Sequence, residues 1–102
     1  MPPEGNPMAA YAIFVREKLR NPALIESYNA KAGPSLAGHP VQVLAAYGGH
    51  ENIEGAPIEG AVILEFPTMA AARAWYDGPA YREAREIRFR AADYRVFFVQ
   101  GT

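Results

Sequence analysis

The chain has 102 residues, half of them apolar and about a fifth charged, so it can form one globular domain around one hydrophobic core. Its formal net charge of −1 gives no electrostatic basis for binding nucleic acid or an anionic membrane surface. Cysteine is absent, which excludes disulfides, thiolate catalysis and thiolate metal sites.

Residues 1–9 carry three prolines and a glycine, and they lack the charged start and apolar centre of a signal peptide. We expect a flexible tail over residues 1–9, with Met8 as an alternative start of translation, and a single domain over residues 10–102. No stretch approaches the roughly 20 apolar residues of a membrane-spanning helix. We therefore expect a cytoplasmic protein that binds neither membrane nor nucleic acid.

The first half of the chain predicts a strand, a helix and a second strand. Residues 10–15 are an apolar run rich in aromatic and β-branched side chains, which is typical of a buried strand. Asn21-Pro22 predicts a helix start, with the asparagine as N-cap and the proline in the first turn. Gly33-Pro34 predicts the end of that helix, and residues 41–47 predict the second strand.

The second half predicts two strands separated by helix. Residues 48–60 are rich in glycine and are expected to form a hairpin loop before a strand over residues 61–66. Thr68 is placed to cap a short helix after that strand. A further helix is expected over residues 80–92 and a last strand over residues 94–99.

The resulting order is β-α-β-β-α-β, with the second helix split at Asp77-Gly78-Pro79, and it predicts a ferredoxin-like α+β fold. The helices of such a fold cover one face of a four-stranded antiparallel sheet. Here both faces are apolar. Alternation places Leu64 and Phe98 on one face of their strands, and their neighbours Ile63 and Phe97 on the other. An uncovered apolar face predicts a homodimer formed through the sheet faces, because pairing would bury it at about 25 cal/mol per Å². The alternative is that the C-terminal segment folds over its own sheet.

One connected pattern runs through the second half of the chain: Glu65-Phe-Pro-Thr68, Ala72-Arg-Ala-Trp-Tyr76, Gly78-Pro-Ala-Tyr81 and Arg88. It resembles the bacterial family called domain of unknown function 1330 (DUF1330). There a strand ends in Glu-Phe-Pro, a helix ends in Trp-Tyr, a Ser-Pro-Glu-Tyr turn follows, and the next helix carries an arginine. The resemblance covers nearly all of residues 10–101.

The resemblance implies a dimeric α+β barrel. Proteins of that superfamily include small monooxygenases that need no cofactor, lactone isomerases, haem-degrading enzymes and ligand-responsive regulatory domains, so the fold alone assigns no activity. The chain departs from the family pattern at Gly78 and Ala80, which replace serine and glutamate. His39 stands where a glycine commonly follows the first helix.

Glu65 and Arg88 are the polar residues expected at buried positions. Glu65 lies among apolar neighbours on the face assigned to the dimer, so it needs a partner or a proton. It is a candidate general base, or else an acceptor for Arg95 or for the partner subunit. Arg88 shares a helix face with Tyr81 and Ala84 and is expected to point towards the sheet. It could bind a substrate carboxylate, or tie its helix to strand-end carbonyls or to Glu65.

Aromatic residues gather around the helix break, and Tyr28, Trp75, Tyr76 and Tyr81 are expected either in the core or around a small ligand pocket. His39 is a candidate for the rim of that pocket and for acid-base chemistry with Glu65 and Arg88. His39 and His50 do not form a metal-binding pattern, so neither a metal nor a cofactor is predicted.

Three hypotheses follow. The dimer could bind a small organic metabolite without changing it, or it could transform one without a cofactor. Alternatively, it could be a non-catalytic structural or regulatory dimer with no small-molecule ligand.

Overall fold

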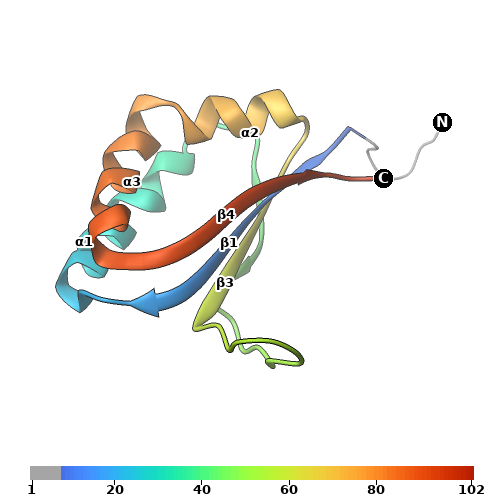
Figure 1. Cartoon of the computed structure of the whole chain (residues 1–102). Coiled ribbons are helices and arrows are strands. Elements are labelled where there is room, and N and C mark those ends of the chain that lie inside the picture. Colours follow the sequence, from blue (N-terminus) through green and yellow to red (C-terminus); the bar gives the residue numbers. More distant parts are fainter. Residues whose placement is uncertain (1–7) are drawn as a thin grey trace.

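The computed structural model describes residues 8–102, which form one antiparallel sheet covered by helices on one face (Figure 1). The sheet has the strand order β2-β3-β1-β4 and the fold is ferredoxin-like α+β, as predicted. The strands are β1 (Ala10–Leu19), β2 (Gln42–Ala46), β3 (Gly60–Phe66) and β4 (Ala92–Gln100). The helices are α1 (Pro22–Ala32), the 3₁₀ turn η1 (Pro34–Leu36), α2 (Met69–Tyr76) and α3 (Pro79–Ala91).

Helix starts follow the local signals in the sequence. The Asn21 side chain accepts a hydrogen bond from the Leu24 amide at 3.2 Å, and Pro22 occupies the first turn of α1. Thr68 Oγ1 accepts one from the Ala71 amide at 3.0 Å at the start of α2. Each cap satisfies a backbone N–H that has no partner within its own helix, so both predicted caps are confirmed.

Three strands are longer than predicted, β3 only by Gly60 at its start. β1 continues beyond residue 15 to Leu19 because β4 pairs with it along this whole length, across a bulge between Arg16 and Lys18. The last helix ends at Ala91, one residue before the predicted end, and Ala92 already has extended backbone angles and begins β4. Long-range strand pairing therefore overrides the polar composition of residues 16–18.

Away from the bulges in β1 and β2, successive side chains alternate between the two faces of the sheet. On the face under the helices, Phe14, Leu64 and Phe66 are buried in the core together with Trp75 and Tyr81 from the helices. The other face is here called the open face, and its residues in β1, β3 and β4 are Tyr11, Ile13, Val15, Ala61, Ile63, Glu65, Arg95, Phe97 and Val99. Phe97 on this face is 52 % exposed.

The C-terminal segment does not fold across the open face. The Gly101 amide donates to the Ala9 carbonyl at 2.7 Å, so the end of the chain continues alongside β1. Ala9 is buried, although the flexible tail was predicted to extend to residue 9, and residues 1–7 of that tail lie outside the described range. Within residues 8–102, no helix is long and apolar enough to cross a membrane.

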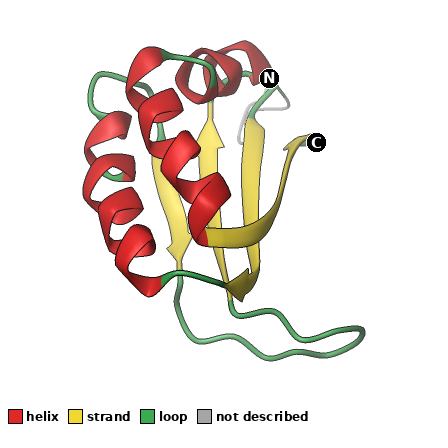
Figure 2. Cartoon of the chain, turned by 60° about the vertical axis from the view of Figure 1, so that its left-hand side comes forward, coloured by secondary structure: helices red, strands yellow, loops and turns green. Residues whose placement is uncertain are grey.

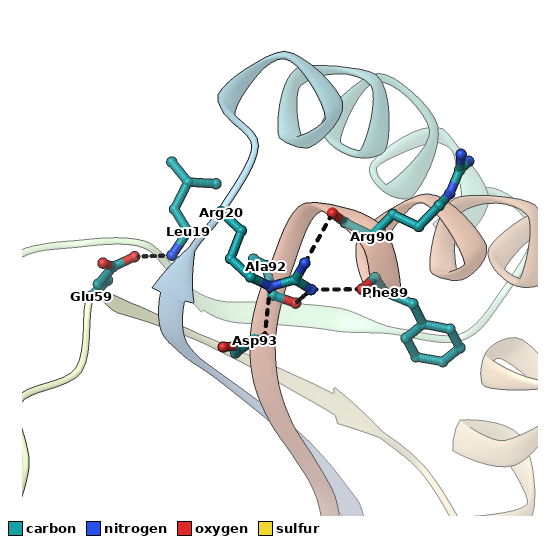
Figure 3. A network of polar contacts seen from close by, with 7 residues as sticks. All are labelled: Leu19, Arg20, Glu59, Phe89, Arg90, Ala92 and Asp93. Atoms are coloured by element: carbon teal, nitrogen blue, oxygen red, sulfur yellow. Dashed lines mark hydrogen bonds and ion pairs between the residues drawn. The ribbon is translucent and has the colours of Figure 1, made fainter.

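Arg20 ties the end of α3 to the end of β1 (Figure 3). Its guanidinium donates to the carbonyls of Phe89, Arg90 and Ala92 at 2.7, 3.3 and 3.2 Å, and to Asp93 Oδ1 at 2.8 Å. These carbonyls lie at the C-terminus of the helix, where acceptors lack intrahelical partners and the helix dipole favours a cation. Arg20, which the sequence analysis did not single out, therefore ties the end of α3 to the end of β1.

Gly78 permits the sharp break between α2 and α3. A Cβ atom at this position would lie 2.8 Å from the Ala74 carbonyl oxygen, which is closer than carbon and oxygen tolerate. The two helices can therefore follow one another with only Asp77 and Gly78 between them. The family pattern has serine here, so the turn of this chain is tighter than a serine would allow.

Replacing Gly78 with alanine is expected to lower the free energy of unfolding by about 1–3 kcal/mol, because the added carbon meets a backbone atom that cannot rotate away. Gly33→Ala is the matched control, since Gly33 has right-handed helical angles and open space around it. That variant should be neutral or up to about 1 kcal/mol more stable. Urea unfolding at one fixed protein concentration measures both, and equal effects would contradict the steric explanation.

Replacing Arg20 with methionine is expected to cost about 1–2 kcal/mol of unfolding free energy, because three helix-end carbonyls lose their donor. Arg73→Met removes an equally charged side chain that is more exposed and pairs with Asp77, four residues further along the chain. This control should change stability by less than about 0.5 kcal/mol. An Arg20 variant as stable as the Arg73 variant would show that the network in Figure 3 adds nothing to stability.

Candidate functional site

A cavity of about 280 Å³ lies between the helices and the β2 end of the sheet. Its lining is mostly apolar, with aromatic side chains from strand, helix and loop: Phe14, Tyr28, Tyr47, Trp75 and Tyr81. Val43 and Ala46 of β2 also line it and are exposed, so the cavity opens to solvent beside this edge strand. Three of the four predicted pocket residues therefore lie around one cavity, and Tyr76 is not among its lining residues.

Trp75 and Tyr81 form the wall on the side of the helix break. Their ring centres are 4.2 Å apart, because Gly78 lets α3 turn back directly after α2. Trp75 Nε1 donates to Ser35 Oγ at 3.0 Å, and Ser35 Oγ donates to the Ala32 carbonyl at 2.5 Å. This chain of bonds fixes the indole ring against the turn after α1, so the wall is held in place by polar contacts as well as packing.

Two tyrosine pairs place hydroxyl groups in or beside the cavity, whose lining also includes Asn29. The Tyr28 and Tyr81 hydroxyls lie 2.9 Å apart, and the Tyr47 and Tyr94 hydroxyls lie 2.5 Å apart. Burial raises the pKa of Tyr81 to about 12, and it raises the pKa values of Tyr28 and Tyr47 further. All three phenols are therefore protonated donors at neutral pH rather than bases.

Arg88 lies behind this wall and is only 3 % exposed. Its guanidinium carbon is 5.5 Å from the centre of the Phe14 ring and 5.2 Å from that of Tyr94. Nη2 donates to the Tyr76 hydroxyl at a long 3.4 Å. Arg88 therefore points towards the sheet, as its helical position indicates, and contacts mainly aromatic faces.

Glu65 lies on the open face, where it accepts a hydrogen bond from the Tyr11 hydroxyl at 3.2 Å. This bond and the carboxylate charge raise the pKa of Tyr11. The expected contact with Arg95 is wrong, because Arg95 donates instead to Glu17 at 3.0 Å. A shallow hollow at the sheet edge, lined by Pro40, Gln42 and Glu65 among others, adjoins the carboxylate.

The three residues considered for catalysis do not converge within one chain. Arg88 packs on Phe14 under the helices, whereas Glu65 pairs with Tyr11 on the opposite face of the sheet. His39 follows η1 and lines neither the cavity nor the hollow beside Glu65. His50 contacts the Ile58 carbonyl at 3.1 Å within the long hairpin loop that extends past the sheet in Figure 2. Residues 8–102 contain no cluster of three metal-ligating side chains.

Sequence reasoning missed Tyr47 and Tyr94. Tyr47 adopts a left-handed backbone angle, with φ of 56°, that is unusual for a residue other than glycine. Its ring lies against Gly60, where a Cβ atom would be 2.8 Å from Tyr47 Cδ1. A glycine at the first position of β3, opposite an aromatic residue at the end of β2, was the available signal.

Solved structures with low identity share this fold. A protein of unknown function from Rhodopseudomonas palustris is 21 % identical, with 94 % of this chain and 84 % of that chain covered and a TM-score of 0.70. A dimeric ferredoxin-like protein of unknown function from Thermobifida fusca is 18 % identical, with 91 % of each chain covered and a TM-score of 0.66. The hydroxynitrile lyase of Passiflora edulis is 14 % identical, with 94 % and 95 % covered and a TM-score of 0.72. At these identities the likeness shows the fold alone.

The search of curated proteins gives no match. The family model described as "Domain of unknown function (DUF1330)" matches residues 9–102, nearly the whole domain, including the strand end at Glu65, the Trp75-Tyr76 pair and Arg88. The resemblance seen in the sequence is therefore confirmed, and the chain belongs to the DUF1330 family.

Proposed function

We propose that this protein is a homodimer that binds a small, flat and mostly apolar organic molecule in the cavity beside β2. The observation that carries this proposal is the cavity itself: about 280 Å³ of space, opening to solvent and walled by five aromatic side chains. Ligand pockets in proteins begin at about this size and combine apolar walls with a few polar groups.

The cavity is larger than a packing defect. Protein interiors are close-packed, and the few voids they contain rarely exceed the size of a water molecule. Tyr28 and Tyr81 line the cavity, and their hydroxyl groups, 2.9 Å apart, lie beside a mostly apolar surface. An apolar body with one polar end fits such a lining.

Binding is better supported than catalysis. The hydroxynitrile lyase of Passiflora edulis shares the fold and is an enzyme, but an acid-base mechanism needs its groups within hydrogen-bond reach of one substrate. Here Glu65, Arg88 and His39 are dispersed, and the cavity offers phenols that stay protonated at neutral pH. The remaining alternative is a structural or regulatory dimer whose cavity stays empty.

The open face supports the dimer. It presents Ile13, Ile63, Phe97 and Val99 in adjacent positions of three neighbouring strands. A contiguous apolar surface of this kind marks an interaction site, and a second copy related by a two-fold axis is the commonest occupant. The ferredoxin-like protein of Thermobifida fusca is also dimeric, which agrees with this assembly.

Blocking the mouth of the cavity tests ligand binding. Val43 and Leu44 are neighbours in β2 with similar exposure, 50 % and 47 %, but only Val43 lines the cavity. Naphthylmethanol in about tenfold excess over its Kd should raise the Tm by about 5 °C or more in the wild type and in Leu44→Trp. Val43→Trp fills the entrance and should abolish the rise. Scanning calorimetry measures all three proteins, and a wild type that responds to neither naphthylmethanol nor naphthoate would refute the proposal.

Charging the open face tests the dimer. Phe97→Glu places a carboxylate in the middle of the proposed interface, where burying it unpaired is unfavourable, so the mass measured by light scattering should fall to that of one chain. Phe89→Glu is the control, because Phe89 is equally exposed at 53 % but lies on α3, away from the open face. The control should keep twice the chain mass. A Phe97 variant that remains dimeric would place the interface elsewhere.

A further inference from the structure

We propose that the molecule bound in this cavity is an organic carboxylate, whose oxygens accept hydrogen bonds from the cavity tyrosines while Arg88 behind them balances its charge. The inference rests on the proposed function, since it assigns the chemical class of the ligand of that same cavity.

Arg88 is a buried cation without a counterion. Its Nε and Nη1 atoms are inaccessible to solvent and have no hydrogen-bond partner in the described part of the chain. No carboxylate among residues 8–102 forms an ion pair with it. Arg16, which stacks on Tyr47, does have such a partner in Glu59 at 3.4 Å. A buried charge is costly unless it is balanced, so a negative charge brought close to Arg88 from outside the chain would lower that cost.

The charge of Arg88 acts on the cavity wall. Its guanidinium stacks near Phe14, which lines the cavity, at 5.5 Å from the ring centre. Its positive field also favours negative charge at the Tyr28 and Tyr81 hydroxyls, both of which belong to the lining. An anion at these hydroxyls would therefore lie in the same field. The aromatic faces around Arg88 attract the cation but carry no net charge, so they do not neutralise it.

The tyrosine pairs leave protons free for such an anion. Two hydroxyl groups carry two protons, and a single hydrogen bond between them uses one. The Tyr28–Tyr81 pair therefore retains one O–H donor, and so does the pair formed by Tyr47, which lines the cavity, and Tyr94. Donors to a carboxylate form short, charge-assisted hydrogen bonds.

A matched pair of probes tests this assignment by titration calorimetry at neutral pH. Naphthoate and naphthylmethanol share one flat apolar body, but only naphthoate carries a negative charge. The wild type should bind naphthoate about tenfold or more tightly than naphthylmethanol, because only the naphthoate carboxylate is stabilised by the positive charge of Arg88. Arg88→Met should reduce this preference to about one while leaving the affinity for naphthylmethanol unchanged.

Two further variants serve as controls. Arg82→Met removes a positive charge from the exposed side of α3 and should keep the full preference. Arg88→Lys retains the positive charge and should keep most of the preference for naphthoate. If Arg88→Met does not fold, Tyr81→Phe gives the second readout, because it should weaken naphthoate binding more than naphthylmethanol binding.

The outcomes separate the two proposals. A wild type that binds both probes equally, or an Arg88→Met variant that keeps the preference, would overturn the carboxylate assignment while the ligand-binding cavity stands. Failure of both probes to bind would overturn the binding function and this assignment together.

Discussion

Three neighbouring strands of this small sheet carry apolar side chains on both faces, and the rest of the structure follows from the need to bury both. The helices can cover only one face, because each crossover connection returns on the same side. Burial of the first face builds the core and its cavity. The second face, which includes Ile13, Ile63 and Phe97, is left uncovered in the single chain, where Phe97 is 52 % exposed.

The cavity exists because the helix layer is interrupted. Asp77 and Gly78 end α2 and allow α3 to begin at Pro79, which brings Trp75 and Tyr81 into contact at one end of the layer. At the other end β2 is short and its residues are largely exposed, so nothing comparable to α3 covers Val43 and Ala46. The cavity is the space between the Trp75 and Tyr81 rings and the exposed edge strand β2. Its position is therefore set by backbone geometry at Gly78 rather than by any single lining residue.

Local signals predicted the local features. Asn21 and Thr68 cap their helices through hydrogen bonds to residues only three positions further along the chain. Alternation along β3 assigned Leu64 and Ile63 to opposite faces. What depends on strand pairing was not predictable from one sequence. Tyr47 contacts Tyr94, which is 47 positions away in the sequence, and Arg20 contacts the end of α3, which is about 70 positions away. Glu65 and Arg88 lie on opposite faces of the sheet, so they do not meet within one chain.

Strand β3 would contribute one face to ligand binding and the other to the proposed dimer interface. Val62 and Leu64 line the cavity, and the residues between and beside them, Ile63 and Glu65, lie on the open face. A strand transmits displacement directly to the adjacent position, because its backbone hydrogen bonds hold successive residues in fixed register. A ligand that pushed β3 outward would therefore alter the surface offered to the partner subunit. The same alternation thus provides a physical route by which an occupied cavity could change the strength of the proposed dimer.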